Sequence, residues 1–198
     1  MAVTVRDYEE LAFAASRMIQ KVQCFAGYNE LGVRQSGCIT LVILQKDYKD
    51  GRNRFYDLKG QVENFMKGKI GNSLLEREAF SIIEPEFVEL SVRAEIYADG
   101  FEDVFRIKKQ VMDKLTEFLD PVTGNFDGCG WEIGTLPNAF QIRNAISDMI
   151  GNGQIKQVFL SAFEGEKDNR VEVEMDRILK HKYILPVSGE HEAIIHIR

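Results

Sequence analysis

Three histidines near the end of the sequence, His181, His191 and His196, are the first residues whose chemistry could be functional. The segment HEAIIH superficially matches the zinc-binding helix of metalloproteases, in which two histidines share one helix face. The spacing does not fit, because histidines five residues apart do not lie on one helix face as i and i+4 residues do. In a strand, they would point to opposite sides. We therefore expect no metal site here.

Cysteine, serine and carboxylate side chains are the other candidates for nucleophiles or acid–base groups. Cys129 lies within a glycine-rich stretch whose surroundings could favour an exposed thiolate, but no base is identifiable. Ser188 and the other serines lack a nucleophile-elbow context such as G-x-S-x-G. The carboxylates of IIEPEFVELSVRAE alternate with apolar residues and belong to a solvated face. We expect no catalytic residue; an enzyme whose site forms around Cys129, with a histidine brought near by folding, is an alternative.

The stretch GNFDGCGWEIGTLP, residues 124–137, contains four glycines and the only tryptophan of the chain. Backbone N–H groups in such a stretch can bind an anion. A nucleotide loop, however, follows a strand and carries a lysine, whereas the preceding residues are helix-periodic and the stretch has no lysine. The pattern favours a tight structural loop pinned by Trp131, and an anion-binding module is a second alternative.

Composition limits the partners. The chain has 198 residues, a formal net charge of −6 and three cysteines with no CxxC pair. The negative charge argues against nucleic-acid binding, which depends on clustered Lys and Arg, and the cysteines define neither a disulfide framework nor a zinc knuckle. No apolar run reaches the roughly 20 residues that span a bilayer, and the charged N-terminus lacks the apolar core of a signal peptide. We expect no cofactor, no nucleic-acid partner and no membrane association.

Hydrophobic periodicity predicts the elements that must position these residues. Helical spacing begins at Thr4, where Thr4 and Asp7 can form a capping pair, and so early a cap suggests a fragment of a longer protein. Strict alternation in FVELSVRAEIYADG predicts a strand with one dry and one wet face. Further helices are predicted around residues 55–70, 104–119 and 137–150. Further strands are predicted in KVQCFAG, GCITLVIL, IKQVFLSAF, VEVEMDRI and EAIIHIR.

These elements predict an α+β fold in which helices lie on one face of mostly antiparallel sheets. The order helix, strand, turn, strand occurs at residues 4–45 and again at 137–175, which indicates a weakly repeated helix-strand-strand unit. We expect two small sub-domains. Residues 1–75 would form the first, and residues 76–198 would form the second.

Three stretches carry a resemblance to a known family. AVTVRDYEELAFAAS followed by KVQCFAG resembles a repeated entry into a helix and strand, and GCITLVIL resembles the strand that comes next. LDPVTGNFDGCGWEIGTLPNAFQIRNAI is similar to a hallmark in which an L-D-P turn and a G-W-x-x-G element introduce a helix. In this order they resemble the C-terminal part of the baseplate J-like proteins of contractile phage tails and related injection systems. At Glu132 and Ile133, members usually have proline and phenylalanine.

The resemblance implies a structural role for the loop. Gly128, Gly130 and Gly134 would allow positive φ at sharp bends, Trp131 would anchor the loop on the core, and Pro137 would preset the backbone for the next helix. It also implies a baseplate wedge component, not an enzyme, that pairs with copies of itself as a homodimer or ring and with neighbouring baseplate proteins. Such a protein would be cytoplasmic during assembly and then part of the virion or of a phage-like particle.

Overall fold

The computed structural model describes residues 3–50, 52–71, 79–101, 104–165 and 170–198. By its internal contacts the chain divides into two compact units, Met1–Pro85 and Glu86–Arg198. The sequence had suggested a boundary after residue 75. The division falls later because a short strand, β3 (Phe80–Ile83), pairs with a strand of the first unit.

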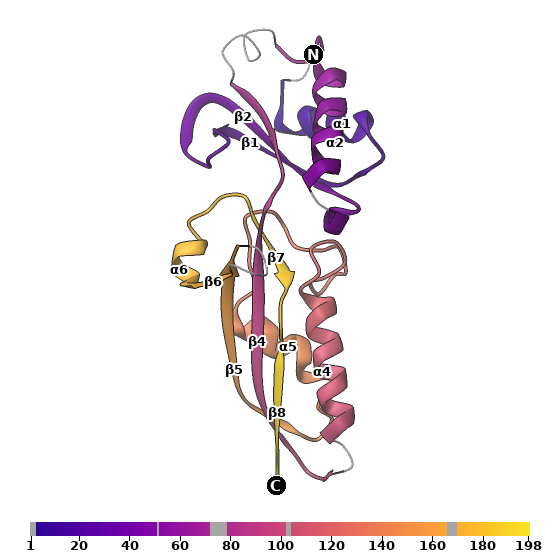
Figure 1. Cartoon of the computed structure of the whole chain (residues 1–198), viewed down its shortest axis with the longest axis vertical. Coiled ribbons are helices and arrows are strands. Elements are labelled where there is room, and N and C mark those ends of the chain that lie inside the picture. Colours follow the sequence, from indigo (N-terminus) through magenta and orange to yellow (C-terminus); the bar gives the residue numbers. More distant parts are fainter. Residues whose placement is uncertain (1–2, 51, 72–78, 102–103, 166–169) are drawn as a thin grey trace. The chain divides into compact units, whose positions relative to one another are not determined.

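The first unit packs two helices against a three-stranded sheet of order β1-β2-β3 (Figure 1). Helix α1 (Val5–Ala15) begins with the predicted capping box, in which the Thr4 side chain accepts from the Asp7 N–H and the Asp7 carboxylate accepts from the Thr4 N–H. Strands β1 (Ile19–Tyr28) and β2 (Arg34–Gln45) form an antiparallel hairpin. A 3-10 turn, η1 (Tyr48–Asp50), and α2 (Arg52–Met66) then lead to β3, which is parallel to β2.

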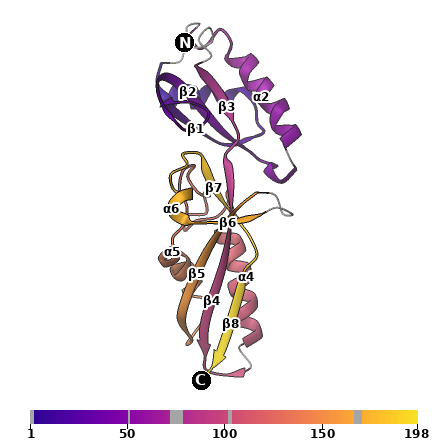
Figure 2. The same cartoon turned by 60° about the vertical axis from the view of Figure 1, so that its left-hand side comes forward.

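The second unit is built around the long strand β4 (Glu86–Ala98), whose predicted alternation is confirmed. Every second residue from Val88 to Ala98 is buried. Strand β5 (Gln154–Glu164) pairs antiparallel with β4, and β6 (Val171–Val173) pairs antiparallel with β5. Helices α4 (Val104–Phe118) and α5 (Ala139–Ser147) contact each other and pack on the sheet, as Figures 1 and 2 show.

One edge of β4 is occupied by two strands that lie end to end. Strand β7 (Ile184–Ser188) pairs with the beginning of β4, and β8 (Glu192–Ile197) pairs with its end, both in parallel (Figure 2). The register runs from Leu90↔Ser188 to Arg93↔Glu192, so that three residues, 189–191, stand opposite two, 91–92. The extra residue makes this junction a β-bulge.

The α+β class is confirmed, but three details differ from the sequence predictions. Three of the six strand pairings among the described residues are parallel, so the sheets are mixed. Strands β3 and β7 were not predicted. VEVEMDRI is a strand only as far as Val173, and it continues as the short helix α6 (Met175–Ile178), whose turn brings Ile178 to full burial.

Candidate functional site

The glycine-rich loop is anchored by Trp131. The indole ring is 3% exposed, and its Nε1–H donates to the Phe118 carbonyl at 2.8 Å. It also meets the Phe118 ring edge to face, with centroids 5.3 Å apart. The contacted carbonyl belongs to the last turn of α4, where carbonyl groups lack an intrahelical partner. Trp131 therefore both packs on α4 and satisfies one of its terminal acceptors.

The backbone donors of this loop are largely used within the protein. Asp120 Oδ1 accepts from the N–H groups of Val122 and Thr123 at the end of α4. Seven other N–H groups of the loop donate to carbonyl or side-chain oxygens of the chain. These donors belong to Gly124, Asn125, Phe126, Cys129, Gly130, Gly134 and Thr135. An anion nest requires convergent N–H groups that are free to bind a ligand. The loop geometry therefore gives little support to the anion-binding alternative.

The end of the loop leads into α5 in a way that the sequence predicted only approximately. The Gly134 N–H donates to Ile184 O at 2.7 Å, which joins the loop to β7. Helix α5 begins at Ala139 after a capping box formed by Asn138 and Gln141. Pro137 precedes the N-cap and lies outside the helix, so the capping box sets the start of α5.

Cys129 is exposed in this loop. Its backbone N–H donates to Asp127 Oδ1, and its Sγ lies 3.7 Å from the Asp127 carbonyl oxygen. It lines neither the pocket beside Arg170 nor the one in the β1–β2 hairpin. It is also not a member of the group of three possible metal ligands found among the described residues. These two pockets and this group therefore do not support the enzyme alternative.

The three histidines lie in three different settings. His181 Nδ1 is 3.1 Å from Glu86 Oε2, and the His196 ring packs beside Tyr97, with centroids 5.5 Å apart. His191 lies in the bulge between β7 and β8, close to Ser188. No sequence pattern connects Ser188 with His191, whereas the fold brings their side chains together.

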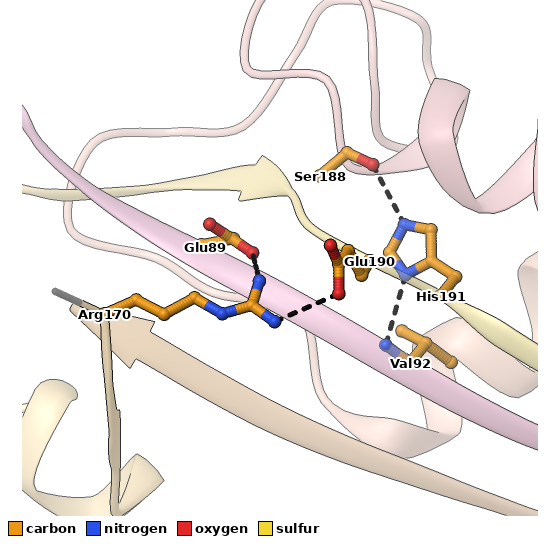
Figure 3. Close-up of polar contacts among 6 residues, drawn as sticks. All are labelled: Glu89, Val92, Arg170, Ser188, Glu190 and His191. Carbon is orange, nitrogen blue, oxygen red and sulfur yellow. Dashed lines mark hydrogen bonds and ion pairs between the residues drawn. The ribbon is translucent and has the colours of Figure 1, made fainter. Parts of the chain in front are cut away.

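The bulge contains a group of hydrogen-bonded polar residues (Figure 3). The Val92 N–H of β4 donates to His191 Nδ1 at 3.1 Å, and His191 Nε2 lies 2.9 Å from Ser188 Oγ. The imidazole thus provides an acceptor for a β4 amide at the point where the strand register is interrupted. Gly189 permits this geometry, because a Cβ there would lie 2.7 Å from Glu89 Cγ and 2.8 Å from Ser91 Oγ.

The protonation of His191 decides what the Ser188–His191 pair can do. Because Nδ1 accepts the Val92 N–H, the proton of the neutral ring is on Nε2, which donates to Ser188 Oγ. A general base would instead need a free lone pair on Nε2 to remove the serine proton. Burial also lowers the pKa of His191 to about 4. The pair resembles a catalytic dyad in composition, but in this tautomer it has a structural role. We call the hydrogen bonds of His191 with Val92 and Ser188 the clasp.

Arg170 lies beside the bulge and contacts two glutamates, as Figure 3 also shows. Arg170 donates to Glu89 at 2.7 Å and to Glu190 at 3.0 Å. The hydrogen bond with Glu190 is the largest factor that raises the pKa of Arg170. These residues, with Ser188 and Gly189, line an open pocket of about 400 Å³. Since one guanidinium serves both carboxylates, it compensates half of their negative charge within this pocket.

The buried His191 makes stability depend on pH. Its pKa is about 4 in the folded chain and 6.5 as an ordinary value, so that below pH 6.5 the unfolded chain binds a proton that the folded chain does not. Stability should therefore fall as pH drops from about 6.5 to 4, by about 2 kcal/mol after allowance for partial exposure. Urea unfolding of the wild type and of His191→Gln at several pH values would measure the difference.

A matched control separates this effect from the titration of carboxylates. His196→Gln removes an imidazole that lies outside the bulge and leaves the Val92 N–H its acceptor, so comparison with it distinguishes loss of the His191 contacts from loss of any histidine. If His191→Gln and the wild type lose the same stability between pH 6.5 and 4.5, the clasp does not contribute in this way.

No protein-family model matches the chain, and a search of curated proteins finds no match either. No helix among the described residues is long and apolar enough to cross a membrane. One signal of the bulge is present in the sequence, because Gly189 interrupts an apolar stretch and an isolated glycine in a strand pattern suggests a bulge.

Proposed function

We propose that this protein is a structural component of a contractile, phage-tail-like baseplate and that it assembles with copies of itself and with neighbouring baseplate proteins. The resemblance of the Trp131 loop and its flanking stretches to baseplate J-like proteins carries this proposal. The hydrogen bonds within the loop support it. They connect the loop to the end of α4 through Trp131 and to β7 through Gly134, and so fix the turn that leads to α5. A subunit of a large assembly needs such fixed geometry in order to present the same surfaces in every copy.

The edges of the second sheet are the surfaces that we propose for self-association. Among the described strands, β8 pairs only with β4 and β6 pairs only with β5. Ile197 on β8 and Val171 on β6 are 39% and 64% exposed. An edge strand can add to the sheet of another subunit, and a lysine on the edge opposes this pairing.

Sedimentation of the whole chain over a range of concentrations tests this part of the proposal. We expect reversible self-association that is weakened about tenfold or more by Ile197→Lys or by Val171→Lys, whichever edge is used, since one lysine would disrupt the edge. The variant at the other edge serves as the matched control. A strictly monomeric wild type at high concentration, or association unchanged in both variants, would contradict the use of these edges.

The baseplate assignment needs a test of its own. Phage-like particles purified from the source cells should contain this chain at the baseplate end, as shown by mass spectrometry and by antibody labelling in electron micrographs. Deletion of its gene should leave tails without a complete baseplate. Intact contractile particles that lack the chain would refute the proposal, whatever the sedimentation result.

A further inference from the structure

A second polar cluster lies apart from the bulge. It consists of Glu86 at the start of β4, Glu164 at the end of β5 and His181 between α6 and β7. One carboxylate oxygen from each glutamate and one ring nitrogen of His181 all lie within 4.8 Å of one another. Within the described part of the chain, this is the group in which three possible metal ligands converge.

The charge of this cluster differs from that of two other carboxylate sites on or beside the same sheet. Glu89 shares Arg170 with Glu190, and Glu95 binds Lys156 at 2.7 Å. The ionic contact of Glu86 among the described residues is with His181, at 3.1 Å, and Glu164 forms no ion pair with a described Lys or Arg. Two negative charges therefore face one imidazole, which provides no permanent positive charge.

The donor set indicates which ion could supply that charge. Two carboxylate oxygens and one imidazole nitrogen suit a divalent transition ion, whereas Mg²⁺ and Ca²⁺ prefer oxygen ligands alone. Ligands of one such ion lie at about 2.0–2.2 Å from it, and so roughly 3–3.5 Å from each other. Glu86 and His181 already have this separation. The side chains of both are more than 40% exposed, so that they are free to adjust toward Glu164.

We propose that Glu86, Glu164 and His181 bind a divalent transition ion such as Zn²⁺, with water in the remaining positions. The ion would join the beginning of β4, the end of β5 and the segment that enters β7, and would so hold three segments distant in sequence. This inference does not depend on the baseplate assignment, because every residue in it belongs to the second unit and no partner is required.

Calorimetric titration of the untagged, chelator-treated whole chain with Zn²⁺ tests the proposal. We expect one ion per chain for the wild type. Glu164→Gln and His181→Gln should each weaken binding about tenfold or more, because each removes one of three ligands and even the loss of a residue that only orients a ligand typically costs this much. Titration with Co²⁺ should give visible absorption bands that the same two variants lose, and Mg²⁺ should not compete. Circular dichroism would show that the variants remain folded.

Two variants control for adventitious binding. His196→Gln and Cys129→Ser remove other residues able to bind Zn²⁺ and should leave the affinity unchanged. The proposal is overturned if the wild type binds no Zn²⁺, or if Glu164→Gln and His181→Gln bind it as the wild type does. Loss of binding in Cys129→Ser alone would place the ion elsewhere and would also overturn it.

Discussion

Replacing Trp131 by alanine should lower the free energy of unfolding of the second unit by about 3–5 kcal/mol, the usual range for removing a large buried aromatic ring. The ring is 3% exposed and meets the Phe118 ring edge to face. The change also removes the Nε1–H that donates to Phe118 O, so that this carbonyl keeps only the hydrogen bond from the Asn125 N–H. Urea unfolding followed by far-UV circular dichroism measures the effect.

Trp131→Phe is the matched control, because it keeps an aromatic ring against Phe118 but has no N–H donor. We expect a smaller loss, about 2 kcal/mol, which combines a lost hydrogen bond with some lost volume. The wild type and both variants should retain the same first unit, so an unfolding transition that belongs to residues 1–85 should not move. An unfolding midpoint unchanged by Trp131→Ala would mean that the loop is not held by this ring.

Replacing Gly130 by alanine should cost about 3 kcal/mol or more, because two independent effects add. Gly130 has φ of +75°, a conformation that strains any residue with a Cβ. A Cβ at this position would also lie 2.3 Å from Pro121 O and 2.8 Å from Val122 O. These are backbone atoms of the turn that leaves α4, so they cannot rotate away as a side chain would. Urea unfolding again provides the measurement.

Gly128→Ala separates conformational strain from steric overlap. Gly128 has φ of +70°, close to that of Gly130, but a Cβ there would meet no atom within 4 Å. Its cost should therefore be the strain alone, about 1 kcal/mol. Equal losses in the two alanine variants would show that the close approach to Pro121 is relieved by a small shift of the loop. The two positions would then tolerate a Cβ equally well.

Together these variants test a physical statement about the loop. The turn from α4 to α5 has a fixed path for three reasons. Many of its N–H groups are bonded within the chain, a Cβ at Gly124, Gly130 or Gly134 would overlap backbone atoms, and Trp131 is buried at its centre. If the paths of α4 and α5 depend on this loop, its variants should also weaken any assembly that requires the outer surfaces of these helices. Stability and self-association can therefore be measured on the same set of variants.

Sequence patterns predicted the helices and strands whose structure depends on residues close together in the chain. The alternation from Val88 to Ala98 predicted β4, because side chains in a strand point alternately to its two faces. Thr4 and Asp7 predicted the start of α1, because the capping box joins residues three apart. The helical spacing of apolar residues predicted α4, whose buried positions include Ile107, Val111 and Leu115.

The elements that were missed depend on partners far away in the chain. Strand β7 is short and contains Pro186, so its composition does not indicate a strand, yet it pairs in parallel with β4. VEVEMDRI was predicted as one strand because its first residues alternate. Burial of Ile178 against the rest of the unit favours a helical turn there. Tertiary packing overrides local preference in such short segments.

The sequence alone determined which residues form the dry face of β4, where α1 begins and which residue is large enough to anchor the glycine-rich loop. Only the tertiary structure decided that His191 accepts from Val92, 99 residues away, that Ser188 receives the proton of its ring, and that Glu86, Glu164 and His181 converge. The reason is that periodicity and capping act over a few residues. Strand register and the meeting of side chains are set by how whole elements pack, and a bulge of one residue changes both.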